Sequence, residues 1–284
     1  MWVNLVRYCQ AEGYKLQSFE KLITVGAPIP PDLHRRFRSL VSPGVQVFTP
    51  YGATEGLPVS LIGTDTILGG TAAATAQGDG TCVGHPAPGM TIRIIRITEA
   101  PIETWSEDLL LPEGEIGEVV IDGAVVSPEY KERPDANAKA KIAAEGRVLH
   151  RMGDLGYLDS QGRLWFCGRK AHRLQTPTGM VPAVPVEGVY NEHPKVLRTA
   201  LVGTGPAGHE VPVLCVELEA GEHWSPVLEE ELKALAVNSR WSGVVQHILH
   251  HPGFPTDARH NSKIRREDLK PWAEARVANA MVRA

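Results

Sequence analysis

The sequence predicts an α/β fold followed by a separate α+β unit, and three observations support this class. A strand, a helix and a second strand follow one another near the N-terminal end, in the ranges 21–28, 30–41 and 44–52. Between residues 58 and 167 the chain carries short apolar segments separated by Gly, Pro and Asp. After residues 168–173 helical and strand patterns alternate again, as expected for a second domain.

The N-terminal part predicts a parallel α/β layer. Apolar residues at helical spacing open the chain: Trp2, Leu5, Val6 and Cys9. Leu33, Phe37 and Leu40 share one face of the predicted helix 30–41, whose prolines suit a first turn. Because this helix joins two apolar strands, we expect those strands to lie parallel.

The middle of the chain predicts a small, mostly antiparallel, barrel-like β unit. Its expected strands are 58–62, 91–97, 115–121, 147–151 and 162–168. Residues 157–166 predict a hairpin whose turn is Asp159–Gly162. The stretch 69–81, GGTAAATAQGDGT, is small and polar enough to predict a mobile loop.

The C-terminal part predicts a separate, mobile α+β domain. Helices are expected at 186–194, 225–240 and 266–282, and strands at 196–203, 211–219 and 244–250. Ser225 is the candidate N-cap of the second helix, and Pro271 is expected to break or kink the last one. The predicted domains are therefore 1–168 and 169–284.

Composition narrows the functional classes. The chain has 284 residues, 43% of them hydrophobic, and a net charge of −4, which gives no sign of nucleic-acid or membrane-surface binding. The four cysteines are far apart and predict reduced thiols without a metal site. No apolar run is long enough for a membrane span, and we expect a soluble, cytoplasmic protein.

Four polar features could form one site. Tyr51, Gly52, Thr54 and Glu55 follow the apolar strand 45–48, and they offer a ring for a base, a hydroxyl for phosphate and a carboxylate for Mg²⁺. An ordinary turn at the end of a strand is the alternative. Asp154 could accept ribose hydroxyls, although its pattern, taken alone, is more typical of a turn aspartate.

Two cationic residues complete this set. Arg169 has a planar guanidinium suited to ribose or phosphate oxygens, and Lys263 could stabilise a developing negative charge as a compact cation. Each, taken alone, is more typical of a solvated surface residue.

These motifs, in this order, resemble the adenylate-forming superfamily of acyl-CoA synthetases, peptide-synthetase adenylation domains and luciferases. The resemblance rests on five segments that span the chain: VGAPIP (25–30), YGATE (51–55), GEIGEVVIDG (114–123) followed by Tyr130, GDLGYLDSQGRLWFCGR (153–169) and SKIRR (262–266). It implies a large domain whose C-terminal part is residues 1–168, and a small C-terminal domain.

The resemblance also implies residue roles. Tyr51 would stack on adenine beside the turn of Gly26, Ala27 and Pro28, with Gly52 in the same motif. Thr54 would contact the α-phosphate of ATP, and Glu55 would hold Mg²⁺. Asp154 and Arg169 would bind ribose, and Lys263 would stabilise the transition state that gives acyl-AMP and pyrophosphate.

Departures from the usual motifs narrow the resemblance. Ala171 replaces the usual Asp or Lys of the hinge, only Gly179 and Glu187 match the segment that helps build the CoA path, and Ser262 replaces the glycine before the lysine. Together with GTCVGHPAPGM (80–90) and DARHNSKI (257–264), these departures resemble the olefin β-lactone synthetases of bacterial hydrocarbon biosynthesis. An acyl-CoA ligase with unusual motifs is the alternative.

The resemblance to β-lactone synthetases implies a substrate and partners. A long-chain 2-alkyl-3-hydroxy fatty acid would be activated with ATP and closed to a β-lactone and AMP, in association with other hydrocarbon-biosynthesis enzymes. Among the nearby histidines His150, His172 and His260, His260 is the candidate base for the 3-hydroxyl; a structural, hydrogen-bonding role is the alternative.

One expected part is not found in the sequence. The Gly/Ser/Thr-rich phosphate loop of the superfamily should lie well upstream of Tyr51, and only 50 residues precede that tyrosine. The resemblance therefore implies a C-terminal fragment that does not adenylate an acid by itself. A non-catalytic remnant that retains nucleotide-binding or partner-binding surfaces is a further alternative.

Overall fold

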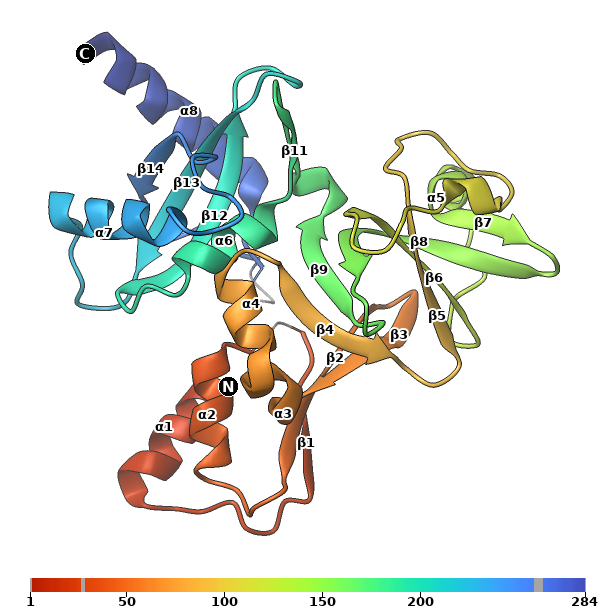
Figure 1. Ribbon diagram of the computed structural model, residues 1–284, viewed down its shortest axis with the longest axis horizontal. Helices are drawn as coiled ribbons and strands as arrows, with labels where there is room; N and C mark the ends of the chain where they lie inside the picture. Colours follow the sequence, from red (N-terminus) through yellow and green to blue (C-terminus); the bar gives the residue numbers. More distant parts are fainter. Residues whose placement is uncertain (1, 27–28, 258–262, 284) are drawn as a thin grey trace. The chain divides into compact units, whose positions relative to one another are not determined.

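A computed structural model describes residues 2–26, 29–257 and 263–283. The chain forms two compact units, which are described separately below (Figure 1). The first comprises Met1–Ala72 and Cys82–Trp165, and the second comprises Ala73–Thr81 and Phe166–Ala284. The assignment of 1–168 and 169–284 to two enzyme domains stays a prediction.

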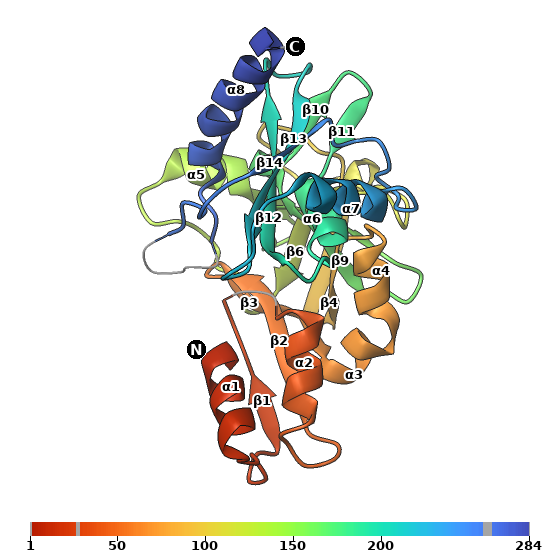
Figure 2. The ribbon, with the colours of Figure 1, turned by 90° about the vertical axis from the view of Figure 1, so that its left-hand side faces the viewer.

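The first unit begins with the expected α/β layer. Its elements are α1 (Trp2–Glu12), β1 (Lys21–Ile23), α2 (Pro31–Arg38) and β2 (Gln46–Ala53). Strands β1 and β2 are parallel, with Leu22 opposite Val47. Helices α1 and α2 pack on these strands (Figures 1 and 2) around a buried cluster of Val6, Cys9, Leu22, Leu33, Phe37, Leu40 and Val47. The predicted strand–helix–strand order and its parallel pairing are confirmed.

Further strands extend β2 into a mixed sheet, and the last of them, β9, continues from the first unit into the second. They are β3 (Gly56–Gly63), β4 (Thr81–Pro86), β5 (Met90–Ile95), β6 (Gly117–Gly123), β7 (Lys141–Ala144), β8 (Arg147–Leu158) and β9 (Leu164–Arg169). Over the described ranges the order is β1-β2-β3-β4-β9-β8-β6-β5, with β7 paired to β8. The pairs β2–β3, β3–β4, β5–β6, β6–β8 and β7–β8 are antiparallel, as predicted.

This sheet is open, which corrects the expected barrel-like unit. Strands β1 and β5 end the strand order, so the sheet does not close on itself in the part of the chain that the structure describes. The short helices η2 (Glu107–Leu109) and α5 (Pro134–Ala140) lie in its connections. Strand spacing in the sequence predicted the antiparallel pairs, but it could not tell whether the terminal strands meet.

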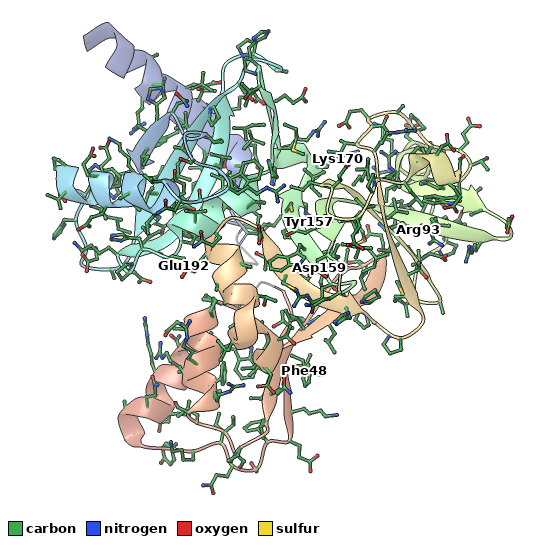
Figure 3. All side chains as sticks on the ribbon, in the orientation of Figure 1. Phe48, Arg93, Tyr157, Asp159, Lys170 and Glu192 are labelled. Atoms are coloured by element: carbon green, nitrogen blue, oxygen red, sulfur yellow. The ribbon has the colours of Figure 1, made fainter. Side chains whose placement is uncertain are left out.

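The predicted hairpin joins β8 to β9, and Asp159 organises its turn (Figure 3). The Asp159 Oδ1 atom accepts the backbone N–H groups of Gln161 and Arg163 at 3.0 and 2.9 Å, and Oδ2 accepts Trp165 Nε1 at 2.8 Å. Burial opposes ionisation of this carboxyl, but the hydrogen bonds from Trp165 and Arg163 outweigh it and lower the pKa of Asp159.

The stretch expected to be a mobile loop contains helical turns instead. After α3 (Thr64–Thr66), the π-helical segment η1 (Ile67–Thr71) leads into α4 (Ala72–Ala76). The run of alanines favours a helix because alanine has the highest helix propensity. Gly70 takes a φ of 150° at the kink within η1, a conformation that a side chain would disfavour. The prediction weighed the small, polar composition and overlooked this propensity.

The second unit is built on an antiparallel pair with a parallel third strand: β12 (Val196–Thr204), β13 (Val211–Leu218) and β14 (His247–His250). Helices α6 (Ala183–Tyr190) and α7 (Pro226–Ala236) cover one face, and α8 (Arg266–Arg283) covers the other (Figure 2). The short η3 (Lys170–His172), β10 (Leu174–Thr176) and β11 (Gly179–Val181) precede them. The predicted α+β elements of this unit are confirmed.

The helix ends follow the sequence in one case and depart from it in another. Ser225 caps α7, because its side chain accepts the N–H of Leu228 at 3.2 Å. Helix α8 continues through Pro271, so the predicted break is wrong. Pro271 lies in the second turn, and the packing of Leu269, Ala273 and Val277 on the sheet holds the helix on both sides of it.

Cys9, Cys82, Cys167 and Cys215 are all buried, and none of them forms a disulfide. Among the helices of the described ranges, none is both long and apolar enough to cross a bilayer.

Candidate functional site

Two of the predicted residues meet in the first unit. Tyr51 lies in β2 and Asp154 lies in β8, 103 positions later, and the Tyr51 hydroxyl donates to Asp154 Oδ2 at 2.5 Å. Asp154 is only 3% exposed, so this hydrogen bond lies in surroundings where it is strong. The structure thus brings together the residues expected at the base and at the ribose of a nucleotide.

The turn between β2 and β3 carries Thr54 and Glu55. A Cβ atom on Gly52 would lie 2.5 Å from the carbonyl oxygen of Gly56, so the close approach of the two strands at this turn requires glycine. Thr54 is exposed, and Glu55 is half-buried. A hydroxyl and a carboxylate are therefore presented side by side at the end of the hairpin.

Glu55 is held by a residue that the sequence only partly indicated. The Tyr130 hydroxyl donates to Glu55 Oε1 at 2.5 Å. Burial of Glu55 disfavours its charge, but the bond from Tyr130, a bond from its own backbone and the nearby Lys141 ammonium lower its pKa below the ordinary value. Burial, and then the bond to Glu55, raise the pKa of Tyr130 to about 12, so its phenol keeps the proton that it donates.

Lys141 and His150 complete this cluster, and the motif argument missed Lys141 altogether. Burial lowers the pKa of Lys141, and the negative charge of Glu55 opposes that effect. His150 is 3% exposed, and burial, followed by repulsion from Lys141, lowers its pKa to about 4, which makes it neutral near pH 7. Its Nδ1 lies 3.2 Å from the carbonyl oxygen of Ala140. No spacing in the sequence relates Lys141 to Glu55, because the contact is made between elements.

The predicted turn after β1 is described only at its first residue. Gly26 is exposed and has a φ of 103°, a backbone conformation that favours glycine. Ala27 and Pro28, which were expected to line the adenine pocket with it, lie outside the described residues.

Arg169 and Lys263 belong to the second unit. Arg169 ends β9 and is exposed. Lys263 is also exposed, and His260, the candidate base, lies outside the described residues. Burial, followed by the positive charge of Arg266, lowers the pKa of the half-buried His172.

The lysine segment, which comprises residues 255–257 and 263–266, is held within the second unit by hydrogen bonds. The N–H of Asp257 donates to the Lys263 carbonyl at 2.9 Å, and that of Arg265 donates to the Pro255 carbonyl at 2.9 Å. Arg266 then forms a bidentate pair with Glu187 of α6, at 2.5 and 2.8 Å. Lys263 therefore lies three residues before Arg266, whose buried ion pair with Glu187 holds this part of the chain against α6.

Comparison with known proteins finds two similar enzymes. The chain is 47% identical over 278 residues, 96% of its length, to the olefin beta-lactone synthetase of Stenotrophomonas maltophilia, and 45% identical over 276 residues, 95% of its length, to that of Xanthomonas campestris. Over almost its whole length the chain is therefore similar to these two enzymes. It spans 50% of each of these two proteins.

Two further comparisons agree. The family described as "AMP-binding enzyme" matches residues 1–131. The amide bond synthetase McbA of Marinactinospora thermotolerans has the same fold, with a TM-score of 0.73 and 23% identity over 95% of this chain and 50% of that structure.

Proposed function

We propose that the protein containing this chain activates a carboxylic acid with ATP, forming an acyl-adenylate and pyrophosphate. The bond between Tyr51 and Asp154 supports this proposal, because it joins a residue suited to a purine with one suited to a ribose. The carboxylate of the substrate attacks the α-phosphorus, and pyrophosphate leaves. Arg169 contributes to ribose binding, and Lys263 stabilises the negative charge of the transition state.

The residues around the β2–β3 turn fit a magnesium ion. Glu55 is a hard oxygen ligand whose lowered pKa keeps it ionised, and the Thr54 hydroxyl is available beside it for the α-phosphate. In the described ranges no group of three or more His, Cys, Asp or Glu side chains could hold a metal ion. Mg²⁺ typically needs only one or two carboxylates of the protein, together with the phosphates of its nucleotide. When bound, the ion neutralises phosphate charge.

We propose further that the acid is a long-chain 2-alkyl-3-hydroxy fatty acid, and that the product is a β-lactone. The observation that carries this proposal is the 47% and 45% identity to two olefin beta-lactone synthetases over almost the whole chain. In the second step the 3-hydroxyl oxygen attacks the acyl carbon, AMP leaves and the hydroxyl proton passes to a base. Because the nucleophile is part of the substrate, no second substrate has to be oriented.

The test uses a hybrid protein that is about as long as the relatives. This chain is joined to the part of the Stenotrophomonas maltophilia protein that the match leaves uncovered, and the hybrid is incubated with ATP, Mg²⁺ and a 2-alkyl-3-hydroxy fatty acid, with and without CoA. We expect a β-lactone of the acid's mass minus water, together with AMP, in both mixtures. The parent Stenotrophomonas protein is the control for the assay.

Two outcomes contradict parts of this proposal. If the product is a CoA thioester that forms only when CoA is present, the protein does not close a β-lactone and is an acyl-CoA ligase, the alternative. Failure of the hybrid to release pyrophosphate, while the parent protein releases it, contradicts adenylation itself and favours a non-catalytic, nucleotide-binding role.

A further inference from the structure

Glu55 occupies a position where a side chain would ordinarily be mobile. It lies at the short turn between β2 and β3, beside the exposed Thr54. A carboxylate that rotates freely loses conformational entropy when it binds a cation, and it also samples orientations that cannot bind. The surroundings of Glu55 remove this freedom.

The segment from Ser127 to Lys141 holds both the backbone and the side chain of Glu55. The N–H of Ser127 donates to the carbonyl of Glu55 at 2.8 Å. The Tyr130 hydroxyl donates to Oε1 of the same residue at 2.5 Å. Glu55 is therefore attached to this segment at two points, about one side-chain length apart.

Tyr130 is itself fixed from two directions. Its backbone is clamped by one side chain, because Asn137 Oδ1 accepts the Tyr130 N–H at 2.7 Å and Asn137 Nδ2 donates to the Tyr130 carbonyl at 3.0 Å. Its ring lies beneath Lys141, whose Nζ is 5.3 Å from the ring centroid. The same ammonium donates to Ser127 Oγ at 3.1 Å, so Lys141 ties the two attachment points of Glu55 together.

Within the part of the chain that the structure describes, the other carboxylate oxygen of Glu55, Oε2, accepts no side-chain hydrogen bond. Tyr130 contacts Oε1, and its phenol donates a proton without bringing a charge that would compete with a cation. In known metal sites such outer partners orient the ligands and are worth about 10- to 100-fold in metal affinity.

We propose that Tyr130 is a positioning residue that aims the Glu55 carboxylate at a divalent cation, with Asn137 and Lys141 holding Tyr130 in place. This inference rests on the proposed role of Glu55 as a magnesium ligand. Tyr130 acts through Glu55 and contacts neither the ion nor the substrate.

The experiment compares three single-atom or near-isosteric changes. Tyr130→Phe deletes only the hydroxyl, Glu55→Gln removes the ligand charge, and Tyr8→Phe makes the same chemical change as the first at an exposed tyrosine in α1. Binding of Mn²⁺ to the 284-residue chain, alone and with α,β-methylene-ATP, is measured from the electron paramagnetic resonance signal of the free ion. Circular dichroism and thermal unfolding of each variant show whether its fold is retained.

We expect Tyr130→Phe to weaken Mn²⁺ binding about 10- to 100-fold, Glu55→Gln to weaken it at least as much, and Tyr8→Phe to leave it unchanged. If Glu55→Gln loses Mn²⁺ binding and Tyr130→Phe keeps it, the inference about Tyr130 is overturned while the proposed role of Glu55 stands. Unchanged binding in Glu55→Gln, or no binding by the unmodified chain, contradicts the role of Glu55 and overturns the inference with it.

A merely structural role for Tyr130 predicts a different pattern. In that case Tyr130→Phe lowers the unfolding temperature while the Mn²⁺ affinity of the folded chain stays the same. A second variant, Asn137→Ala, releases the backbone of Tyr130 without touching its hydroxyl, and we expect a smaller loss of Mn²⁺ affinity in the same direction. Normal affinity in both variants rules out positioning by this segment.

Discussion

The substitution Arg266→Met tests how the lysine segment is anchored in the second unit. The Arg266 guanidinium makes two hydrogen bonds to the Glu187 carboxylate, at 2.5 and 2.8 Å, and one to the Leu201 carbonyl at 3.1 Å. The two side chains are 14% and 8% exposed, so the pair is largely removed from water. Methionine fills a similar volume without charge, so the loss of the ion pair dominates the effect.

The size of the expected stability loss follows from the contacts that Glu187 keeps in the Arg266→Met variant. The Glu187 carboxylate keeps one bond to the protein, from the N–H of Leu201 at 2.6 Å, and otherwise stays buried without its counter-ion. Removing one partner of a buried ion pair typically costs about 3–5 kcal/mol. We therefore expect the free energy of unfolding of this unit to fall by that amount.

The assay is urea unfolding followed by tryptophan fluorescence, and three of the six tryptophans, Trp224, Trp241 and Trp272, belong to this unit. The control is Lys233→Met, because Lys233 pairs with Glu229 and Glu230 on the surface of α7 and its side chain is 50% exposed. An exposed ion pair contributes little to stability, so this variant should unfold almost as the unmodified chain does.

The double variant Glu187→Gln/Arg266→Met separates pairing from packing. With the unpaired charge removed, we expect it to recover part of the stability lost in Arg266→Met. A loss below about 1 kcal/mol in Arg266→Met, or no recovery in the double variant, would refute the argument that this pair anchors the segment.

Three further predictions follow from the structure. In the hybrid protein, Lys263→Ala should lower pyrophosphate release about 10²- to 10³-fold, whereas Lys233→Ala should not change it; equal rates would remove Lys263 from the mechanism. Burial lowers the pKa of His34 to about 4, so the unfolded chain takes up a proton below pH 6.5 that the folded chain excludes, and stability falls with the pH. Between pH 7 and pH 5 this histidine should account for about 2 kcal/mol of the decrease in unfolding free energy, and His34→Asn should remove that share; an unchanged pH dependence would contradict it. Burial raises the pKa of Cys167 and Cys215 to about 12, so a disulfide reagent should react with these thiols slowly in the folded chain and rapidly in urea, and fast labelling without urea would show that they are not buried.

The fold could be predicted wherever one pattern dominated a segment. Helical spacing of Trp2, Leu5 and Cys9, and the Ser225 cap, gave the correct element type from local chemistry alone. Two expectations failed where competing effects had to be weighed: alanine propensity against small, polar composition at α4, and sheet packing against proline at Pro271 in α8. The openness of the sheet depends on which distant strands meet, and periodicity does not record that.

The candidate site shows the same limit. Motif order placed Tyr51 and Asp154 in one site, and the structure joins them directly. The assigned roles of Thr54, Arg169 and Lys263 stay predictions, since a motif gives the residue and its chemistry but not its bound ligand. Lys141 had no motif to indicate it, and its contacts with Tyr130 and Ser127 connect it to Glu55.

The sequence by itself therefore determined the resemblance to adenylate-forming enzymes, the order of the elements and the identity of the polar residues, because these depend on local chemistry and on motif order along the chain. The tertiary structure alone decided which of those residues are fixed in position and which partner residues make the contacts that fix them. Tyr130 and Glu55 are 75 positions apart, and their hydrogen bond exists only because the sheet folds the β2–β3 turn against the segment before β7. Burial there changes the pKa values of Glu55, Tyr130 and His150, a property that belongs to the environment and not to the residue type.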